Sequence, residues 1–136
     1  MGLRSKMKII ITGGRDFSDK EMMFKTLDRI HKKTPIEKLG HGDSTGADSL
    51  AREWGLNNSV IVVGYPAAWS IGKNSGETRN LYMFKDFSPD YILAFPGGKG
   101  TQDSIDFAKK MGYKVVYAKK TMSPRKKDFV RDLTVD

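Results

Sequence analysis

Short apolar segments alternate with segments of helical periodicity along most of this chain, and this alternation limits the folds that it can adopt. Apolar runs bounded by turn residues predict five strands, at Lys8–Thr12, Ile36–Leu39, Val60–Val63, Tyr91–Phe95 and Lys114–Ala118. Apolar residues at helical spacing predict four helices, from the N-cap Asp19 to Lys33 and at Ala47–Leu56, Glu77–Lys85 and Thr101–Met111. Such alternation is typical of a parallel sheet covered by helices on both faces. We therefore predict an α/β fold, a three-layer sandwich with a mainly parallel sheet of about five strands.

The length and composition fit one packed domain. The chain has 136 residues, of which 38% are hydrophobic, and this is enough for a single core. We expect the domain to span residues 1–118 and a basic tail to occupy residues 119–136. The longest apolar runs are far shorter than the ~20 residues that cross a bilayer, and no cleavage signal follows the basic N-terminus. We therefore expect a cytoplasmic protein with no membrane partner.

Net charge and cysteine content limit the kinds of ligand and site that this chain can have. Lys and Arg number 24 against 16 Asp and Glu, which gives a net charge of +8. This charge attracts polyanions or phosphorylated ligands but does not determine the fold. The absence of cysteine excludes disulfides, thiolate metal sites and thiol nucleophiles. With only His31 and His41 we expect no metal site and no required cofactor, although Mg²⁺ could accompany a diphosphate ligand.

Three glycine clusters follow the first, second and fourth predicted strands, at Gly13–Arg15, Gly42–Gly46 and Gly97–Thr101. Because the carboxyl ends of parallel strands share one edge of a sheet, we expect these loops to converge there. Glycine lets the backbone approach a ligand closely, and the following helix N-termini offer N–H groups to a phosphate. The simpler alternative is that the glycines only end the strands. Neither the GxGxxG fingerprint nor a P-loop is present.

Four motifs occur in order along the chain: ITGGRDF at Ile11–Phe17, HGDSTGAD at His41–Asp48, a third that joins Tyr65–Trp69 to Arg79–Met83, and AFPGGKGT at Ala94–Thr101. Together they resemble the motifs of the YspA/YpsA-related branch of the SLOG superfamily. The resemblance implies a Rossmann-like fold that binds a nucleotide or a nucleotide-derived ligand, either ADP-ribose-like or a nucleoside phosphate. It also implies a homodimer or a higher oligomer. A sensor or sequestering domain is the function that we favour.

The glycine loops and the resemblance together indicate one set of ligand-binding residues. These candidates are Gly13, Gly14, Arg15, Gly42, Gly46, Asp48, Trp69, Arg79, Asn80, Pro96, Gly97, Gly98, Gly100 and Thr101.

An enzyme is the first alternative, because the superfamily includes the LOG phosphoribohydrolases. Their motif is PGGxGTxxE, and an arginine that Arg79 resembles works with its glutamate. Here Ser104 stands at the glutamate position, and a hydroxyl is a poor substitute for a carboxylate beside an oxocarbenium-like state. Asp103 and Asp106 are expected to point elsewhere on their helix. If the chain is an N-glycosidase of nucleoside 5′-monophosphates, the catalytic candidates are Arg79 and Asp48.

A nucleic-acid-binding module is the second alternative. The net charge of +8 and a distant similarity to the DNA-processing protein DprA favour it. The basic tail, however, has no interleaved aromatic residues and no reading motif. Nucleic acid is therefore a possible but not a favoured partner.

Several candidates also have a purely structural interpretation. Asp48 could accept hydrogen bonds from ribose hydroxyls or from loop amides, and we favour the amides. His41 could be a base or could organise its loop. Arg15 and Arg79 could bind phosphate or form surface ion pairs. Trp69 could stack on a base or pack against the core.

Overall fold

The computed structural model describes residues 6–67 and 75–118 of the chain. Strands and helices alternate in the predicted order. The strands are β1 (Met7–Thr12), β2 (Ile36–His41), β3 (Ile61–Gly64), β4 (Tyr91–Ala94) and β5 (Val115–Tyr117). The helices are α1 (Lys20–Lys33), α2 (Ala47–Asn57), α3 (Ser75–Phe87) and α4 (Lys99–Lys110).

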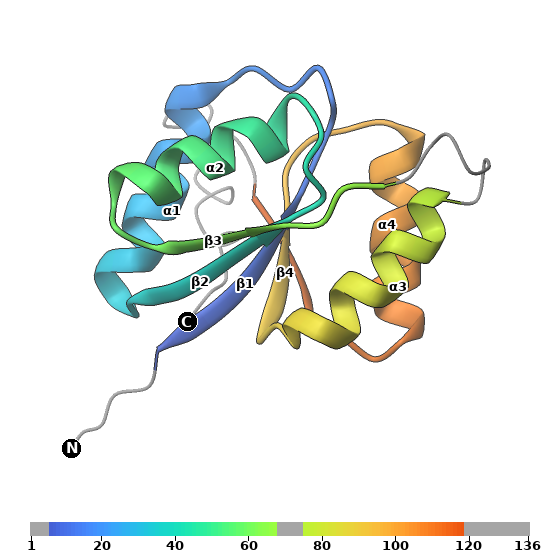
Figure 1. The fold of residues 1–136 in the computed structure, drawn as a ribbon. Coiled ribbons are helices and arrows are strands. Elements are labelled where there is room, and N and C mark those ends of the chain that lie inside the picture. Colours follow the sequence, from blue (N-terminus) through green and yellow to red (C-terminus); the bar gives the residue numbers. More distant parts are fainter. Residues whose placement is uncertain (1–5, 68–74, 119–136) are drawn as a thin grey trace, which may run out of the picture.

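The strands form one parallel sheet in the order β3-β2-β1-β4-β5. Helices α1 and α2 cover one face, and α3 and α4 cover the other (Figure 1). The predicted α/β three-layer sandwich is therefore confirmed. From β1 the chain builds outward to β2 and β3, then crosses back to β4 on the other side of β1. The loops after β1 and β4 thus leave the sheet in opposite directions, and open α/β sheets bind ligands in the crevice at such a switch point.

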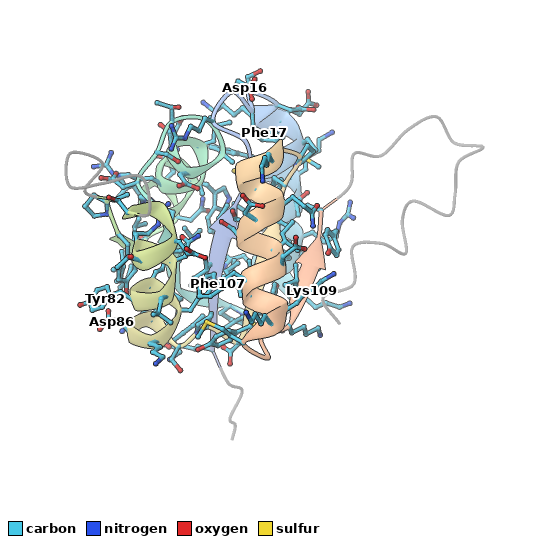
Figure 2. The ribbon with its side chains drawn as sticks, turned by 90° about the vertical axis from the view of Figure 1, so that its right-hand side faces the viewer. Asp16, Phe17, Tyr82, Asp86, Phe107 and Lys109 are labelled. Atoms are coloured by element: carbon cyan, nitrogen blue, oxygen red, sulfur yellow. The ribbon has the colours of Figure 1, made fainter. Side chains whose placement is uncertain are left out.

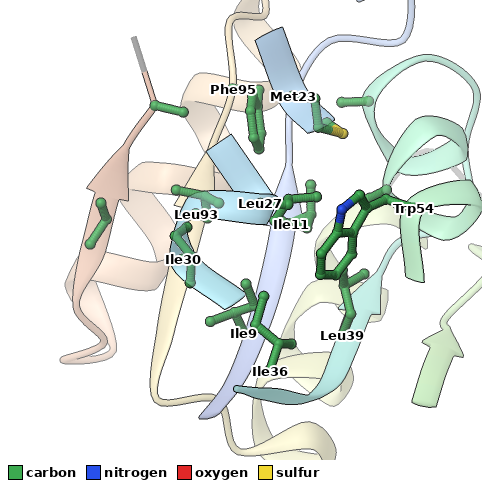
Figure 3. Close-up of a cluster of buried hydrophobic side chains, with 14 of the residues drawn as sticks. Ile9, Ile11, Met23, Leu27, Ile30, Ile36, Leu39, Trp54, Leu93 and Phe95 are labelled. Carbon is green, nitrogen blue, oxygen red and sulfur yellow. The ribbon is translucent and has the colours of Figure 1, made fainter. Parts of the chain in front are cut away.

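The central strand β1 supplies both halves of the core. Its side chains alternate between the two faces, so Ile9 and Ile11 pack beneath α1 and α2, whereas Ile10 packs beneath α3 and α4. The fully buried Trp54 lies beside Leu27 and Ile11 in the first half (Figure 3). This continuous packing fixes the strand ends from which the site loops emerge.

The helix boundaries differ from prediction mainly where glycine is present. Asp19 is the N-cap of α1 as predicted, and its carboxylate accepts a hydrogen bond from the first turn. Helices α3 and α4 each begin two residues before their predicted starts, at Ser75 and Lys99. Glycine has a low helix propensity, so Gly76 and Gly100 concealed these first turns. Both glycines consequently lie inside a helix.

The predicted basic tail lies outside the described residues. In the part of the chain that is described, no helix has the length and apolar character that a membrane span requires.

Candidate functional site

A cavity of about 780 Å³ opens at the carboxyl ends of β1 and β4 and continues between α3 and α4. Figure 2 shows these two helices side by side, with Phe107 on α4. The cavity lies at the predicted edge of the sheet, and its volume is typical of a small-molecule site. Of the predicted site residues, ten line it: Gly13, Gly14, Arg15, Gly42, Asp48, Arg79, Asn80, Gly98, Gly100 and Thr101.

The N-terminus of α4 forms one wall of the cavity. Gly98 is the N-cap, and no side chain caps the helix. The first hydrogen bond of the helix is donated by the Gln102 amide to the Gly98 carbonyl, at 3.0 Å. A Cβ added to Gly98 or Gly100 would meet no atom within 4 Å. Packing therefore does not require either glycine, and their lack of side chains keeps the unpaired helix amides open to the cavity.

Thr101 adds a hydroxyl at the same end of α4. The residue is only 8% exposed and lines the cavity. Its Oγ1 makes no hydrogen bond with any described residue. A buried hydroxyl normally has a partner, so this group is available to a ligand that enters the cavity.

Three predicted residues hold the loops together but do not line the cavity. The Pro96 carbonyl accepts a hydrogen bond from the Gly14 amide at 2.9 Å. A Cβ on Gly97 would meet the Gly14 nitrogen at 2.7 Å. Gly46 has φ of +74°, and a Cβ there would meet the Gly14 carbonyl oxygen. The three glycine loops therefore pack directly on one another around Gly14.

The Asp48 carboxylate accepts hydrogen bonds from the loop after β2. Its Oδ2 accepts hydrogen bonds from the Gly42 amide at 3.0 Å, the Ser44 amide at 3.3 Å and Ser44 Oγ at 2.9 Å. Burial raises the pKa of the Asp48 carboxyl, and the Ser44 hydrogen bonds act against that shift. The favoured interpretation, hydrogen bonding to loop amides, matches this geometry. The carboxylate therefore positions the loop and does not reach toward a reacting bond.

Arg79 crosses from α3 to the loops on the far side of the cavity. Its Nη1 donates to the carbonyls of Gly42 and Tyr65, and its Nε donates to Asn80 Oδ1 at 2.7 Å. A Cβ on Gly42 would lie 2.6 Å from Nη1, so a side chain there would displace the guanidinium. Burial lowers the pKa of Arg79, but the group stays charged. Its Nη2 makes no hydrogen bond within the described part of the chain.

The remaining motif residues have different positions. His41 is buried, and its Nδ1 accepts the Asp43 amide at 2.8 Å, so it organises the loop and does not line the cavity. Burial lowers the pKa of His41, while Asp48 and Asp43 act against that shift. Arg15 is exposed at the cavity mouth. Trp69 lies outside the described residues.

Residues of α4 beyond Thr101 also line the cavity, and the predicted set did not include them: Asp103, Ser104, Asp106, Phe107 and Lys110. Asp103 and Asp106 are exposed, whereas Ser104 is half-buried. That the two aspartates point differently from Ser104 stays a prediction. The signal was present in the sequence, because Asp103, Phe107 and Lys110 recur at spacings of three and four residues.

The charges of the cavity differ from those of the whole protein. Its three cations are Arg15, Arg79 and Lys110, and its five carboxylates are Asp16, Asp48, Glu77, Asp103 and Asp106. Among the described residues, no three of the metal-ligating types gather into a group that could hold a metal ion. At the glycine loops, Arg15 and Arg79 face Asp16 and Asp48, whereas between the helices three carboxylates accompany the single cation Lys110.

This fold and this glycine-lined cavity define a Rossmann-like α/β domain with a cavity at the switch point of its sheet. Residues 7–72 match the model of the YspA, cpYpsA-related SLOG family. The match confirms, over these residues, the resemblance that the sequence motifs predicted. The matched residues include the loops after β1 and β2, whereas Arg79 and the α4 N-terminus lie beyond them. No curated protein and no solved structure matches the chain significantly.

Proposed function

We propose that this protein binds a nucleotide-derived ligand and holds its phosphate group at the N-terminus of α4. The match of residues 7–72 to the SLOG family model supports a nucleotide-related ligand in general terms. The observation that carries the proposal is the uncapped first turn of α4, which Gly98 and Gly100 leave open to the cavity. Unpaired helix N–H groups and the positive end of the helix dipole are suited to bind an anion.

The surrounding groups complete this phosphate site. The hydroxyl of Thr101 has no partner among the described residues and can donate to a phosphate oxygen. Arg79 is held by the carbonyls of Gly42 and Tyr65, so its remaining donors are oriented before a ligand arrives. Preorganised donors lose little entropy on binding, which favours affinity. Arg15 adds a second positive charge at the cavity mouth.

Binding without turnover is the function that this arrangement supports best. Hydrolysis of an N-glycosidic bond needs a carboxylate beside the bond that breaks, and neither of the two positions from which the sequence analysis considered one, residues 48 and 104, supplies it. Asp48, the carboxylate assigned to that role by prediction, hydrogen bonds with Gly42 and Ser44. Ser104 accepts a hydrogen bond from Asn80 at 2.9 Å. We therefore propose a sensor or sequestering domain.

Calorimetric titration with the four common nucleoside 5′-monophosphates and with ADP-ribose tests this proposal. We expect at least one of these ligands to bind wild-type protein and to lose most of its affinity when Thr101 is changed to Val. Chromatography of the same mixtures should show no free base after prolonged incubation. Release of free base that disappears in an Arg79→Ala variant would contradict a purely binding role, and no binding by any ligand would contradict the proposal itself.

A further inference from the structure

The cavity does not end at the phosphate site but continues as a groove between α3 and α4. We define the α3–α4 groove by the residues of both helices that line the cavity: Gly76, Glu77, Asn80, Met83, Gly100, Thr101, Asp103, Ser104, Asp106, Phe107 and Lys110. A helix rises 1.5 Å per residue, so the wall from Gly100 to Lys110 is roughly 15 Å long. This length exceeds what a phosphate group alone would occupy.

The interior of the groove is apolar with a polar link across it. Met83 is buried and Phe107 is half-buried, and both line the cavity. Between the helices, Asn80 Nδ2 donates to Ser104 Oγ at 2.9 Å. Asn80 is 8% exposed and so is fixed in this position. Apolar walls with a few fixed polar groups are typical of sites for flat organic ligands.

Carboxylates outnumber cations on the rim of the groove. Glu77, Asp103 and Asp106 are all exposed and line the cavity, and Lys110 is the one exposed cation among the groove residues. Asp103 lies 3.4 Å from Lys99 Nζ, and Asp106 Oδ1 accepts a hydrogen bond from Gln102 at 2.9 Å. A carboxylate has about four lone-pair sites, so each aspartate retains the capacity to accept further hydrogen bonds. A protein of net charge +8 thus presents carboxylates beside its own ligand cavity.

We propose that the α3–α4 groove holds the nucleoside part of the ligand and that its carboxylate rim selects nucleotides without a second phosphate on the sugar. This inference rests on the proposed function, which puts the 5′-phosphate at the first turn of α4. Asp103 follows Gly100 by three residues, about 4.5 Å farther along the helix. The sugar bonded to that phosphate therefore lies beside the second turn, where Asp103 and Asp106 accept hydrogen bonds from its hydroxyls.

The same rim repels a phosphate at the 3′ position. Two carboxylates close to such a group raise its binding free energy by Coulomb repulsion. A nucleic-acid strand carries a phosphate on both sides of each sugar, so the groove also disfavours nucleic acid. The acidic rim thereby limits what the overall positive charge would otherwise attract.

Calorimetry with matched probes tests the inference. The probes are the four nucleoside 5′-monophosphates and the corresponding 3′,5′-bisphosphates. We expect wild-type protein to bind its preferred monophosphate about tenfold more tightly than the matching bisphosphate. The Asp103→Asn, Asp106→Asn double variant should lose this preference. A Glu21→Gln, Glu37→Gln double variant changes the net charge equally at exposed sites outside the cavity and should retain it.

The possible outcomes separate the two proposals. Loss of the preference in the aspartate variant alone supports the groove assignment. Equal binding of both probes by wild-type protein, or an unchanged preference in the aspartate variant, overturns the groove assignment and leaves the phosphate site intact. Failure of every monophosphate and of ADP-ribose to bind wild-type protein overturns the proposed function and, with it, the inference. Binding of ADP-ribose but of no monophosphate overturns the inference alone.

Discussion

The glycine at position 100 provides the sharpest test of the phosphate site, because its stability and binding effects should have opposite signs. Gly100 lies in the first turn of α4, and a Cβ there would meet no atom within 4 Å. Alanine is favoured over glycine in a helix by about 0.5–1 kcal/mol. We therefore expect Gly100→Ala to stabilise the ligand-free protein by up to about 1 kcal/mol, a rise in Tm of roughly 2–6 °C.

Binding should change in the other direction. The new methyl group would project into the space that the phosphate needs beside the α4 amides, so affinity for the preferred nucleotide should fall at least tenfold, or about 1.4 kcal/mol. Urea denaturation without ligand measures the first effect, and calorimetric titration measures the second. A Gly100→Ala protein that is stabilised and still binds as tightly as wild type would refute the reasoning.

The other end of α4 offers a matched control. Gly112 follows the helix with φ of +90°, and a Cβ there would also meet no atom within 4 Å. Gly112→Ala should therefore destabilise the protein by about 1 kcal/mol through backbone strain alone. It should leave nucleotide affinity unchanged, which separates loss of the site from general destabilisation.

Three further substitutions test individual groups of the site. Thr101→Val removes a hydroxyl that has no partner among the described residues. The free energy of unfolding in urea should therefore stay within about 0.5 kcal/mol of wild type, while nucleotide affinity falls about tenfold. Thr101→Ser keeps the hydroxyl and should retain binding. Arg79→Lys keeps the charge but cannot reproduce the three donor contacts. The free energy of unfolding should therefore fall by about 2 kcal/mol, and nucleotide affinity should also fall. An unchanged urea midpoint would show that these contacts contribute little to stability. Burial lowers the pKa of His41 below its ordinary value of 6.5. Below that pH the unfolded chain protonates His41 more readily than the folded protein does, so stability should decline as the pH falls below about 6.5. His41→Asn keeps an acceptor for the Asp43 amide and should flatten that decline in urea titrations at pH 5 and 7.5, whereas an identical pH dependence would exclude His41 as its source.

The fold was largely predictable because periodicity and turn residues report local structure directly. All five strands and four helices were predicted in order, and the parallel sheet followed from their alternation. The first turns of α3 and α4 were missed, since glycine within a helix resembles loop sequence. The sequence could not reveal that Gly76 lines the cavity, because that depends on how the two helices pack.

The candidate site was predictable as a set of loops but not as individual roles. We predicted from the sequence that Gly14, Arg79 and Thr101 lie near one edge of the sheet, and all three line the cavity. It could not distinguish wall residues from residues that fasten loops, such as Gly46 and Gly97, because that distinction depends on how closely segments far apart in the chain pack. The groove was not predicted, because the spacing of Asp103, Phe107 and Lys110 marks one helix face but does not show that α3 lies opposite it.

The most direct measurement of the central claim is an NMR titration of ¹⁵N-labelled protein with the preferred nucleoside 5′-monophosphate. Backbone amides that bind a phosphate shift strongly, and each amide reports its own position. We predict the largest chemical-shift changes at the amides of Gly98, Gly100 and Thr101, with smaller changes at Gly14 and Arg15. Shifts confined to residues outside the cavity, with the first turn of α4 unmoved, would contradict it.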